Sequence, residues 1–249
     1  MEKIVYAVVS VKESPRDFNE MVRGIEGIAG SALYLLTLND IAIAVSNFTT
    51  SKYNLNKELA LEYAKVIEKL YQQVVLLPIR FGTFLKSDEM IGQLMADHYD
   101  SMVDNLNRVA NKEEYGLKIL WDYEKSKLKI KDSLDSKGIN GKDYFSKETV
   151  YNNYLLEKIK KHRLEDAILK HVEQLIDEIT QHLRQISPEF KCKKMMTNTI
   201  ILDLDFLVQK TKGDEFIQKI EALRLSKEDL HFLLTGPWPP YSFVEITID

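Results

Sequence analysis

The alternation of strands and helices in the first 80 residues is the feature of this sequence that most restricts its fold. The hydrophobic pattern predicts strand, helix, strand, strand, helix and strand, over residues 4–9, 15–23, 32–38, 41–48, 56–70 and 74–81. This is the order of the split βαβ, or ferredoxin-like, arrangement, in which one sheet carries both helices on a single face. We therefore expect the chain to begin with a ferredoxin-like α+β domain.

Local signals agree with this order of elements. Asn39-Asp40 is a tight-turn dipeptide between the two middle strands. The helix that begins at Asn56 repeats apolar residues at the spacing of one buried face: Leu59, Tyr63, Val66, Ile67 and Leu70. Glycines 24, 27 and 30 precede a strand rather than open a helix, so they do not form a phosphate-binding loop.

We expect the first domain to run from residue 1 to residue 131. Ser87 caps a further helix, and His98 lies in its apolar stripe as a core histidine. A strand over residues 115–123 follows and can extend through four alternating lysines, Lys125, Lys127, Lys129 and Lys131. On a strand these lysines would guard an edge against pairing with other chains; the alternative is a docking patch for an acidic partner.

Residues 132–147 are rich in Asp, Ser, Asn and Lys and are predicted to be a linker. Beyond it neither glycine nor proline occurs until Pro188, and apolar residues repeat at steps of four and three. They are Leu164, Ile168, Val172, Leu175, Ile179, Leu183 and Ile186. This stripe predicts a long helix, and the polar run at 157–163 predicts a bend or break upstream of it.

The elements that follow predict a second domain over residues 148–234. Two strands, a helix and a strand are expected near 190–196, 199–208, 214–223 and 230–234. With the preceding helix this reads α-β-β-α-β, a modified ferredoxin-like unit short of its first strand. Residues 235–249 form a C-terminal tail. The predicted fold class is therefore α+β, with two ferredoxin-like domains and a tail.

Composition excludes several classes of protein. Lys plus Arg (34) against Asp plus Glu (38) gives a net charge of −4, whereas a dedicated nucleic-acid binder usually has a basic excess. The single cysteine excludes an internal disulfide framework and suits a reducing cytosol. Because the apolar stretches are far shorter than the roughly 20 residues that span a bilayer, we expect no membrane-spanning segment. We also expect no lipid membrane partner and a cytoplasmic location, which agrees with the single cysteine.

No catalytic motif is present, and the chemistry-bearing residues have structural explanations. Asp203 and Asp205 alternate on a strand and could form a carboxylate pair for a metal or for acid–base work, but no third ligand is visible. His171 and His182 share a helix face about 16 Å apart, too far to share a metal. Cys192 between two lysines is interpreted as an inert thiol. We expect no catalytic residue, no metal and no cofactor.

Two short segments are more informative. Arg80 follows a run that reads as buried and ends at Pro78, so its guanidinium must form a structural ion pair or reach a partner. Three of the six prolines lie within four positions of the tail, among Trp238, Tyr241 and Phe243. This stiff aromatic cluster is either a packing element or a binding surface.

Together these segments resemble one family. Residues 77–83, Leu-Pro-Ile-Arg-Phe-Gly-Thr, and residues 236–243, Gly-Pro-Trp-Pro-Pro-Tyr-Ser-Phe, are similar to two stretches of the gas vesicle protein F/L family. The order, spacing and chain length fit, and Ile79 stands where valine is common. The resemblance implies two ferredoxin-related α+β domains with a tail, no enzymatic activity, and a minor structural or assembly role in contact with the small hydrophobic shell protein.

We therefore expect a non-enzymatic accessory protein, a minor gas vesicle component that binds the shell protein, with other accessory gas vesicle proteins as further candidate partners. Its architectural or contact residues are predicted to be Pro78, Arg80, Phe81, Gly82, Pro237, Trp238, Pro239, Pro240, Tyr241 and Phe243. Pairing of an exposed sheet edge with a β-rich partner is the favoured route. The alternatives are a small-molecule enzyme that uses Asp203 and Asp205, and a cytosolic chaperone of the shell protein.

Overall fold

The structure, a computed structural model, describes residues 2–11, 22–49, 55–136, 150–193, 197 and 199–244, without side chains for 150–156. Its internal contacts divide the chain into two compact units. The first unit consists of Met1–Glu114 together with Gly236–Asp249, and the second of Tyr115–Thr235. Within the described part of the chain, no helix is both long and apolar enough to cross a membrane.

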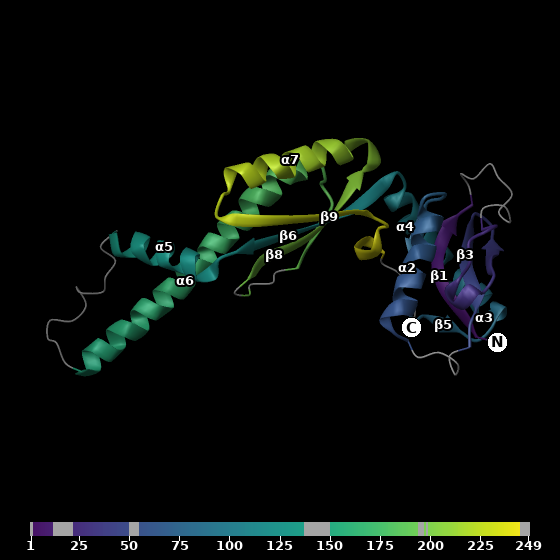
Figure 1. Cartoon of the computed structure of the whole chain (residues 1–249), viewed down its shortest axis with the longest axis horizontal. Coiled ribbons are helices and arrows are strands. Elements are labelled where there is room, and N and C mark those ends of the chain that lie inside the picture. The colour runs from purple at the N-terminus through teal and green to yellow at the C-terminus, as the bar shows by residue number, and fades with distance from the viewer. Residues whose placement is uncertain are drawn as a thin grey trace. The chain divides into compact units, whose positions relative to one another are not determined.

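The first unit is built on a sheet with the strand order β2-β3-β1-β4. Its strands are β1 (Lys3–Ser10), β2 (Leu33–Leu38), β3 (Ile41–Asn47) and β4 (Leu76–Pro78), and the short β5 (Phe84–Leu85) pairs with β1. All of these pairings are antiparallel (Figure 1). Asn39 adopts a positive φ of 50° in the turn between β2 and β3, which confirms the predicted hairpin.

Three described helices pack on this sheet: α2 (Lys57–Tyr71), α3 (Asp88–Asp97) and α4 (Tyr99–Val109). The Asn56 and Ser87 side chains cap α2 and α3 by accepting hydrogen bonds from backbone N–H groups. The predicted stripe of α2 is buried in full, against β1 and β4 among others. Half-buried His98 marks the junction of α3 and α4, so the predicted single helix is two helices, and His98 is not a core residue. The helix expected near residues 15–23 falls largely outside the described residues.

The second unit has a sheet with the equivalent strand order, β7-β8-β6-β9. Its strands are β6 (Lys112–Trp121), β7 (Phe190–Lys193), β8 (Ile200–Gln209) and β9 (Leu230–Trp238). Its helices are α5 (Tyr123–Ser136), α6 (Val150–Arg184) and α7 (Gly213–Ser226). Buried side chains of α6 and α7 form one core with alternate residues of β6 and β8, so both helices cover the same face (Figure 1).

Three expectations about the middle of the chain were wrong. The lysines at 125, 127, 129 and 131 lie in helix α5, not on a strand, because the Asp122 side chain accepts a hydrogen bond from Lys125 N (3.0 Å) and starts a helix there. Helix α6 runs without interruption from Val150 to Arg184, so the polar run at 157–163 makes no break. Asp132–Ser136 belong to α5; the linker expected from 137 onward lies outside the described residues.

The strand that we attached to the first domain, β6, pairs in the second sheet. Strand β6 is therefore the first strand that was missing from the α-β-β-α-β order predicted for the second domain. The division between the compact units accordingly falls at Glu114/Tyr115 rather than at 131, and residues from Gly236 onward group with the first unit. Long-range strand pairing, which local patterns do not encode, decided this boundary.

A buried hydroxyl cluster explains one glycine of the Gly24–Gly30 loop. The Tyr6 hydroxyl lies 2.9 Å from Ser46 Oγ and accepts a hydrogen bond from Ile28 N (2.8 Å), and Ser31 Oγ donates to Ser46 Oγ (2.9 Å). A Cβ atom on Gly27 would lie 2.7 Å from both Ser46 Oγ and the Tyr6 hydroxyl. The loop therefore needs glycine at this position for close packing.

Replacing Gly27 with Ala should lower the free energy of unfolding by about 1–3 kcal/mol, because the added methyl group displaces the Tyr6 and Ser46 hydroxyls. Urea unfolding followed by circular dichroism measures the change. Gly92→Ala is the matched control: its Cβ meets open space inside α3, and alanine there should gain about 0.5–1 kcal/mol. Equal stability of Gly27→Ala and wild type would contradict the packing argument.

Candidate functional site

The arginine loop, residues 79–83, is a turn tied to β1 at both ends. Ile79 N donates to Tyr6 O (2.8 Å), and Val5 N donates to Thr83 O (3.1 Å). Thr83 closes the turn by donating from its N–H and its hydroxyl to Arg80 O, at 3.2 and 2.8 Å. Gly82 has a φ of +90°, a conformation that favours glycine. The backbone thus presents the Arg80 side chain from a fixed turn that follows Pro78, the last residue of β4.

The Arg80 side chain is exposed, and none of the described acidic residues forms an ion pair with it. The structural ion pair that the sequence favoured is therefore missing from the described part of the chain. The buried run does end here, because Ile79 is buried and its neighbour Arg80 is not. An exposed guanidinium on a rigid turn is available to a carboxylate or carbonyl group of a partner.

Tyr63 of α2 is hydrogen-bonded to the backbone of the arginine loop. Its hydroxyl lies 2.6 Å from Ile79 O, 2.9 Å from Val5 O and 3.1 Å from Tyr6 O, and one proton is shared among these acceptors. Its ring also contacts the ring of Phe81, with centroids 5.3 Å apart. Burial raises the pKa of Tyr63 well above its usual range, and the neighbouring Tyr241 and Tyr6 add to the shift. The hydroxyl therefore stays protonated as a donor.

The described part of the C-terminal tail, residues 236–244, is a compact turn structure. The Gly236–Pro237 peptide bond is cis. Pro239 and Pro240 are buried, and a 3₁₀ turn, η5 (Tyr241–Phe243), follows them. Phe243 N donates to Pro240 O (3.2 Å), and the Phe243 side chain is completely buried. Trp238 and Tyr241 are 49% and 43% exposed, so the tail has an inner and an outer set of rings.

A buried carboxylate fastens the tail. Glu114, at the start of β6, accepts hydrogen bonds from Ser242 N and from Ser242 Oγ, each at 2.8 Å. Glu114 is only 6% exposed, and hydrogen bonds to a charged acceptor are stronger than neutral ones. Neither residue was predicted from the sequence. The acidic pair Glu113-Glu114 ahead of an apolar strand looks like an ordinary polar strand end, and only burial distinguishes Glu114.

The arginine loop is bound to α2, and the tail lies close to the same helix. Tyr63 binds the loop, and Tyr241 lies close enough to Tyr63 to influence its pKa. Burial and the carboxylates of Glu114 and Glu68 raise the pKa of Tyr241 to about 12. The structure thus brings together Phe81 and Tyr241, predicted from segments about 155 residues apart, around one helix. Trp238 and Arg80, two other predicted residues, are exposed to solvent.

The carboxylates of the enzymatic alternative are paired with lysines. Lys118 Nζ lies 3.6 Å from Asp203 Oδ2, and Lys193 Nζ lies 3.1 Å from Asp205 Oδ2. Asp205 Oδ2 accepts no hydrogen bond among the described residues, so the charge of Lys193 is what offsets its burial. No group of three or more His, Cys, Asp and Glu residues that could hold a metal occurs within the described ranges. The two aspartates have structural partners, and Cys192 is exposed on β7.

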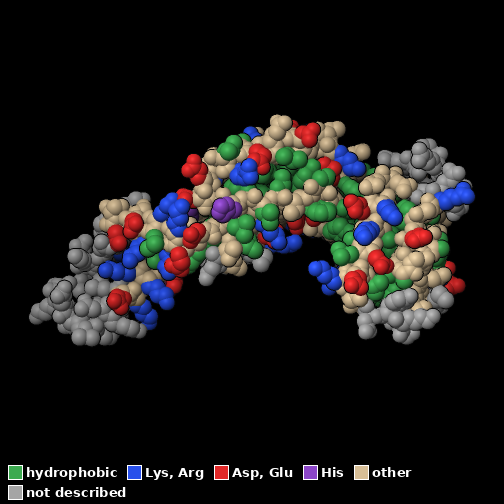
Figure 2. Space-filling model, in the orientation of Figure 1, with side chains coloured by type: hydrophobic (Ala, Val, Ile, Leu, Met, Phe, Trp, Pro, Cys, Tyr) green, Lys and Arg blue, Asp and Glu red, His purple; other side chains and the backbone are tan. Residues whose placement is uncertain are grey.

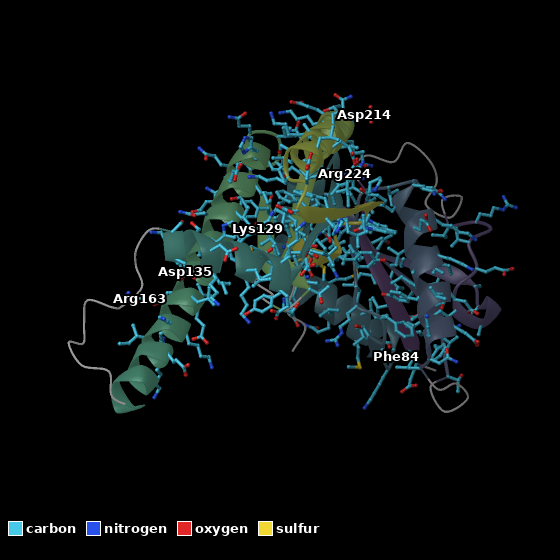
Figure 3. The ribbon with its side chains drawn as sticks, turned by 60° about the vertical axis from the view of Figure 1, so that its left-hand side comes forward. Phe84, Lys129, Asp135, Arg163, Asp214 and Arg224 are labelled. Carbon is cyan, nitrogen blue, oxygen red and sulfur yellow. The ribbon has the colours of Figure 1, made fainter. Side chains whose placement is uncertain are left out.

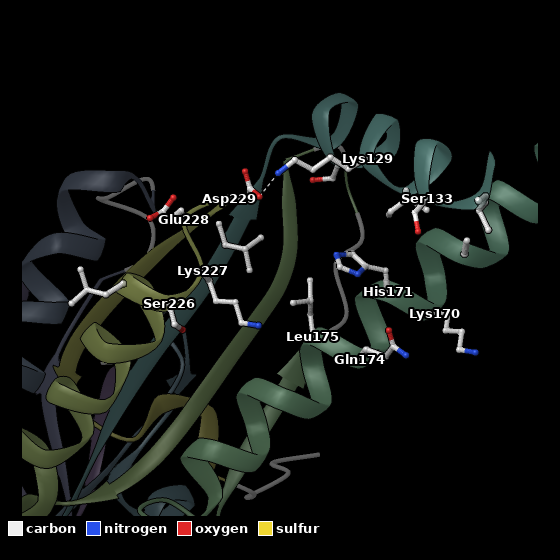
Figure 4. Close-up of a pocket in the computed structure, with 16 residues that line it drawn as sticks. Lys129, Ser133, Lys170, His171, Gln174, Leu175, Ser226, Lys227, Glu228 and Asp229 are labelled. Carbon is white, nitrogen blue, oxygen red and sulfur yellow. Dashed lines mark hydrogen bonds and ion pairs between the residues drawn. The ribbon is translucent and has the colours of Figure 1, made fainter. Parts of the chain in front are cut away.

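A cavity of about 880 Å³ in the second unit lies between α5, α6 and the turn before β9 (Figure 4). Two of the lysines that line it form ion pairs within this chain: Lys129 with Asp229, and Lys227 with Glu178 at 2.6 Å. His171 faces the cavity, and its pKa is lowered by burial and by the charge of Lys227. Its imidazole is therefore neutral at pH 7. These ion pairs tie α5 and α6 to the turn before β9.

Removing the Glu114 carboxylate should release the tail. Glu114→Ala leaves Ser242 N–H without its charged acceptor and should cost about 2 kcal/mol in the free energy of unfolding. Limited proteolysis followed by mass spectrometry should detect faster cleavage near residues 241–244. Ser242→Ala, which removes only the side-chain bond, should have a smaller effect. Protease resistance equal to wild type in Glu114→Ala would contradict this anchoring role.

The raised pKa of Tyr241 has a measurable consequence. At pH 11 its ¹³C-labelled ring should still give the signal of the protonated form, identified by its loss in Tyr241→Phe. Because the neutral form is favoured in the folded state, this group stabilises the fold below pH about 10, and the contribution is lost as the pH rises through about 12. Glu114→Gln should lower the pKa of Tyr241. A titration near pH 10 in the wild type, with circular dichroism still native, would contradict the described environment.

Known proteins resemble this chain in sequence. The family described as gas vesicle synthesis protein GvpL/GvpF matches residues 2–245. Gas vesicle protein F of Dolichospermum flosaquae is 24% identical over 233 residues, which cover 89% of this chain and 91% of that protein. Gas vesicle protein L1 of Halobacterium salinarum is 27% identical over 179 residues, which cover 67% of this chain and 63% of that protein.

Solved structures resemble it in fold. The crystal structure of the gas vesicle protein GvpF from Anabaena sp. PCC7120 matches with a TM-score of 0.84 at 20% identity, over 99% of both chains. That of GvpF from Microcystis aeruginosa matches with a TM-score of 0.77 at 18% identity, over 98% of this chain and 99% of that chain. The family match covers nearly the whole sequence, and the chain therefore belongs to the GvpL/GvpF family of gas vesicle synthesis proteins.

Proposed function

We propose that this protein is a non-enzymatic accessory component of gas vesicles that binds the small hydrophobic shell protein while the vesicle forms. Membership of the GvpL/GvpF family supports a gas vesicle accessory role. We further propose that both compact units are ferredoxin-like, which is supported by the strand order that the two sheets share. The protein acts as a minor vesicle component in the cytoplasm, together with other accessory proteins.

The observation that carries the binding proposal is the edge strand β9. It ends its sheet, and no described strand pairs with its outer side. Natural edge strands usually carry lysine, proline or a covering element that prevents pairing with other chains. Residues 230–235 of β9, Leu-His-Phe-Leu-Leu-Thr, include neither lysine nor proline, and the Leu233 side chain is 50% exposed. An extended segment of the shell protein can add to this edge through backbone hydrogen bonds.

The other edges are less suitable. The opposite edge of the same sheet, β7, carries Lys191 and Lys193 within four residues. In the first unit, β2 is contacted by α3, and its Tyr34 hydroxyl donates to Asp88 at the start of that helix (2.9 Å). The remaining edge, β4, has only three residues and ends at Pro78, so strand addition meets the least opposition at the uncharged part of β9.

The predicted contact residues have two roles in this proposal. Pro78, Gly82, Pro239, Pro240 and Phe243 are architectural, because they are buried or shape a turn; Pro237 shapes the cis turn of the tail. The exposed residues Arg80, Trp238 and Tyr241 supply contacts to the shell protein. Phe81 is half-buried and can serve in either role. Aromatic and arginine side chains on a rigid support are the types that contribute most to binding.

Two alternatives remain distinct from this proposal. A cytosolic chaperone would bind the shell protein but be absent from purified vesicles. An enzyme that used Asp203 and Asp205 would need at least one of these carboxylates to be released from its lysine. The ion pairs favour a structural role for both aspartates.

Substituting Leu233→Lys tests the β9 edge. Co-expression of the tagged protein with its shell protein, followed by affinity capture, should recover roughly tenfold less shell protein for Leu233→Lys than for wild type, because an exposed edge lysine opposes strand addition. Leu169→Lys is the matched control: it is 48% exposed on α6 in the same unit, away from the edge, and should capture shell protein normally. Equal losses in both variants, or none in either, would contradict the assignment to β9.

A vesicle fractionation separates the accessory role from the chaperone. Intact vesicles should contain the protein before a urea wash, and shell protein should co-purify with it from lysate. Co-purification without any protein on vesicles indicates the chaperone. If the protein is absent from vesicles and the shell protein does not co-purify with it, the proposal is wrong.

A further inference from the structure

Helix α5 of the second unit is poorly buried. None of its 14 residues, Tyr123–Ser136, is buried, and Leu128 is 58% exposed. Helices of this length are marginal in water and owe their stability to packing of an apolar face. Helix α5 contacts α6, and Ile130 reaches the core, but Leu128 remains open to solvent. Part of its apolar surface is thus left for another element.

The open surface of α5 continues into a groove against α6. A cavity of about 450 Å³ lies between the two helices. Its apolar residues are Leu128 and Leu134 from α5 and Leu164 from α6. Figure 3 shows Asp135 of α5 and Arg163 of α6 on these neighbouring helices, both of which line the groove. The three leucines offer a site for apolar side chains of a partner.

The charged residues that line this groove are mainly basic. They are Lys127, Lys131, Lys160, Lys161 and Arg163, against Glu124, Asp135 and Glu157. Lys127 pairs with Glu124 at 3.6 Å. Lys131, Lys160 and Lys161 are exposed, and no described acidic residue pairs with them. Figure 2 shows lysines and arginines interspersed with acidic side chains over this end of the second unit. The whole protein carries a net charge of −4, so this excess is local.

We propose that the groove between α5 and α6 binds an acidic amphipathic helix of a partner protein. The partner's apolar stripe lies on Leu128, Leu134 and Leu164, and its acidic flanks meet the lysines of the rim. Lysines on both helices, Lys131 on α5 and Lys160 and Lys161 on α6, match a helix with acidic residues on both sides of its stripe. This surface is separate from the β9 edge and does not depend on the shell-protein proposal.

The occupant is a helix rather than a small anion because the groove combines an apolar floor with cations at its rim. A phosphate or carboxylate alone would need cations that converge on one point, whereas these lysines come from two helices along the groove. An amphipathic helix uses both features at once, with apolar anchors spaced three and four residues apart. Of the four alternating lysines, Lys131 thus serves the acidic partner considered from the sequence, whereas Lys125 and Lys129 pair with Asp229 and Lys127 pairs with Glu124.

The test uses the full-length protein and a fluorescein-labelled synthetic peptide of 18 residues, with a leucine stripe at helical spacing and glutamates on both flanks. Fluorescence anisotropy should show saturable binding at least tenfold tighter than that of a matched peptide with lysines in place of the glutamates. The double variant Lys160→Glu with Lys161→Glu should weaken binding of the glutamate peptide about tenfold. Equal binding of the two peptides, or no binding, would overturn the proposal.

The apolar floor is tested separately. Leu128→Asp should reduce the affinity at least tenfold, and its far-ultraviolet circular dichroism should remain native because Leu128 is 58% exposed. Leu169→Asp, an equivalent change at a 48% exposed leucine of α6 outside the groove, should bind like wild type. Capture of shell protein by Leu128→Asp should be normal. Wild-type affinity in Leu128→Asp, or an equal loss in Leu169→Asp, would count against the groove.

Discussion

The hydroxyl of Tyr63 is the interaction on which the candidate site depends. A single buried O–H from α2 lies within hydrogen-bond distance of three backbone carbonyls, two on β1 and one at the start of the arginine loop. Buried backbone acceptors need a partner, and a loop that leaves a sheet has lost its ladder bonds. Tyr63 supplies the partner from the side chain of a neighbouring helix, and the rigid loop then presents Arg80 to solvent.

The tail is also held by one buried polar side chain, but there the side chain is the hydrogen-bond acceptor. At Tyr63 a buried donor serves backbone acceptors, whereas at Glu114 a buried acceptor serves a backbone donor, Ser242 N–H, and the adjacent hydroxyl. Both contacts include partners far apart in sequence, 58 positions for Tyr63 and Val5 and 128 for Glu114 and Ser242. The two motifs that resemble the gas vesicle family are therefore held by specific polar contacts as well as by apolar packing.

Local signals predicted the elements whose physics is local. The start of α2 next to Asn56, the Ser87 cap, the buried stripe of α2 and the Asn39-Asp40 turn all form as expected. The lysines of α5 misled because a repeat of every second residue fits a strand, while the deciding signal was the capping contact of Asp122.

Long-range features could not be predicted in the same way. The pairing of β6 with the second sheet and the burial of Glu114 depend on residues more than 80 positions away. Arg80 and the tail aromatics of the candidate site were predicted from the sequence. Tyr63 and Glu114, which hold the arginine loop and the tail, carry no sequence signal of that role.

The contrast between a buried carboxylate and an exposed lysine rim has a consequence for ionic strength. Screening extends over about 8 Å at physiological salt, and it weakens interactions among exposed charges far more than those among buried groups. The Glu114–Ser242 contact is shielded from counterions, whereas Lys131, Lys160 and Lys161 stand in the ionic atmosphere. A rise in salt should therefore leave the tail contact in place while it weakens the attraction of the proposed groove for an acidic helix.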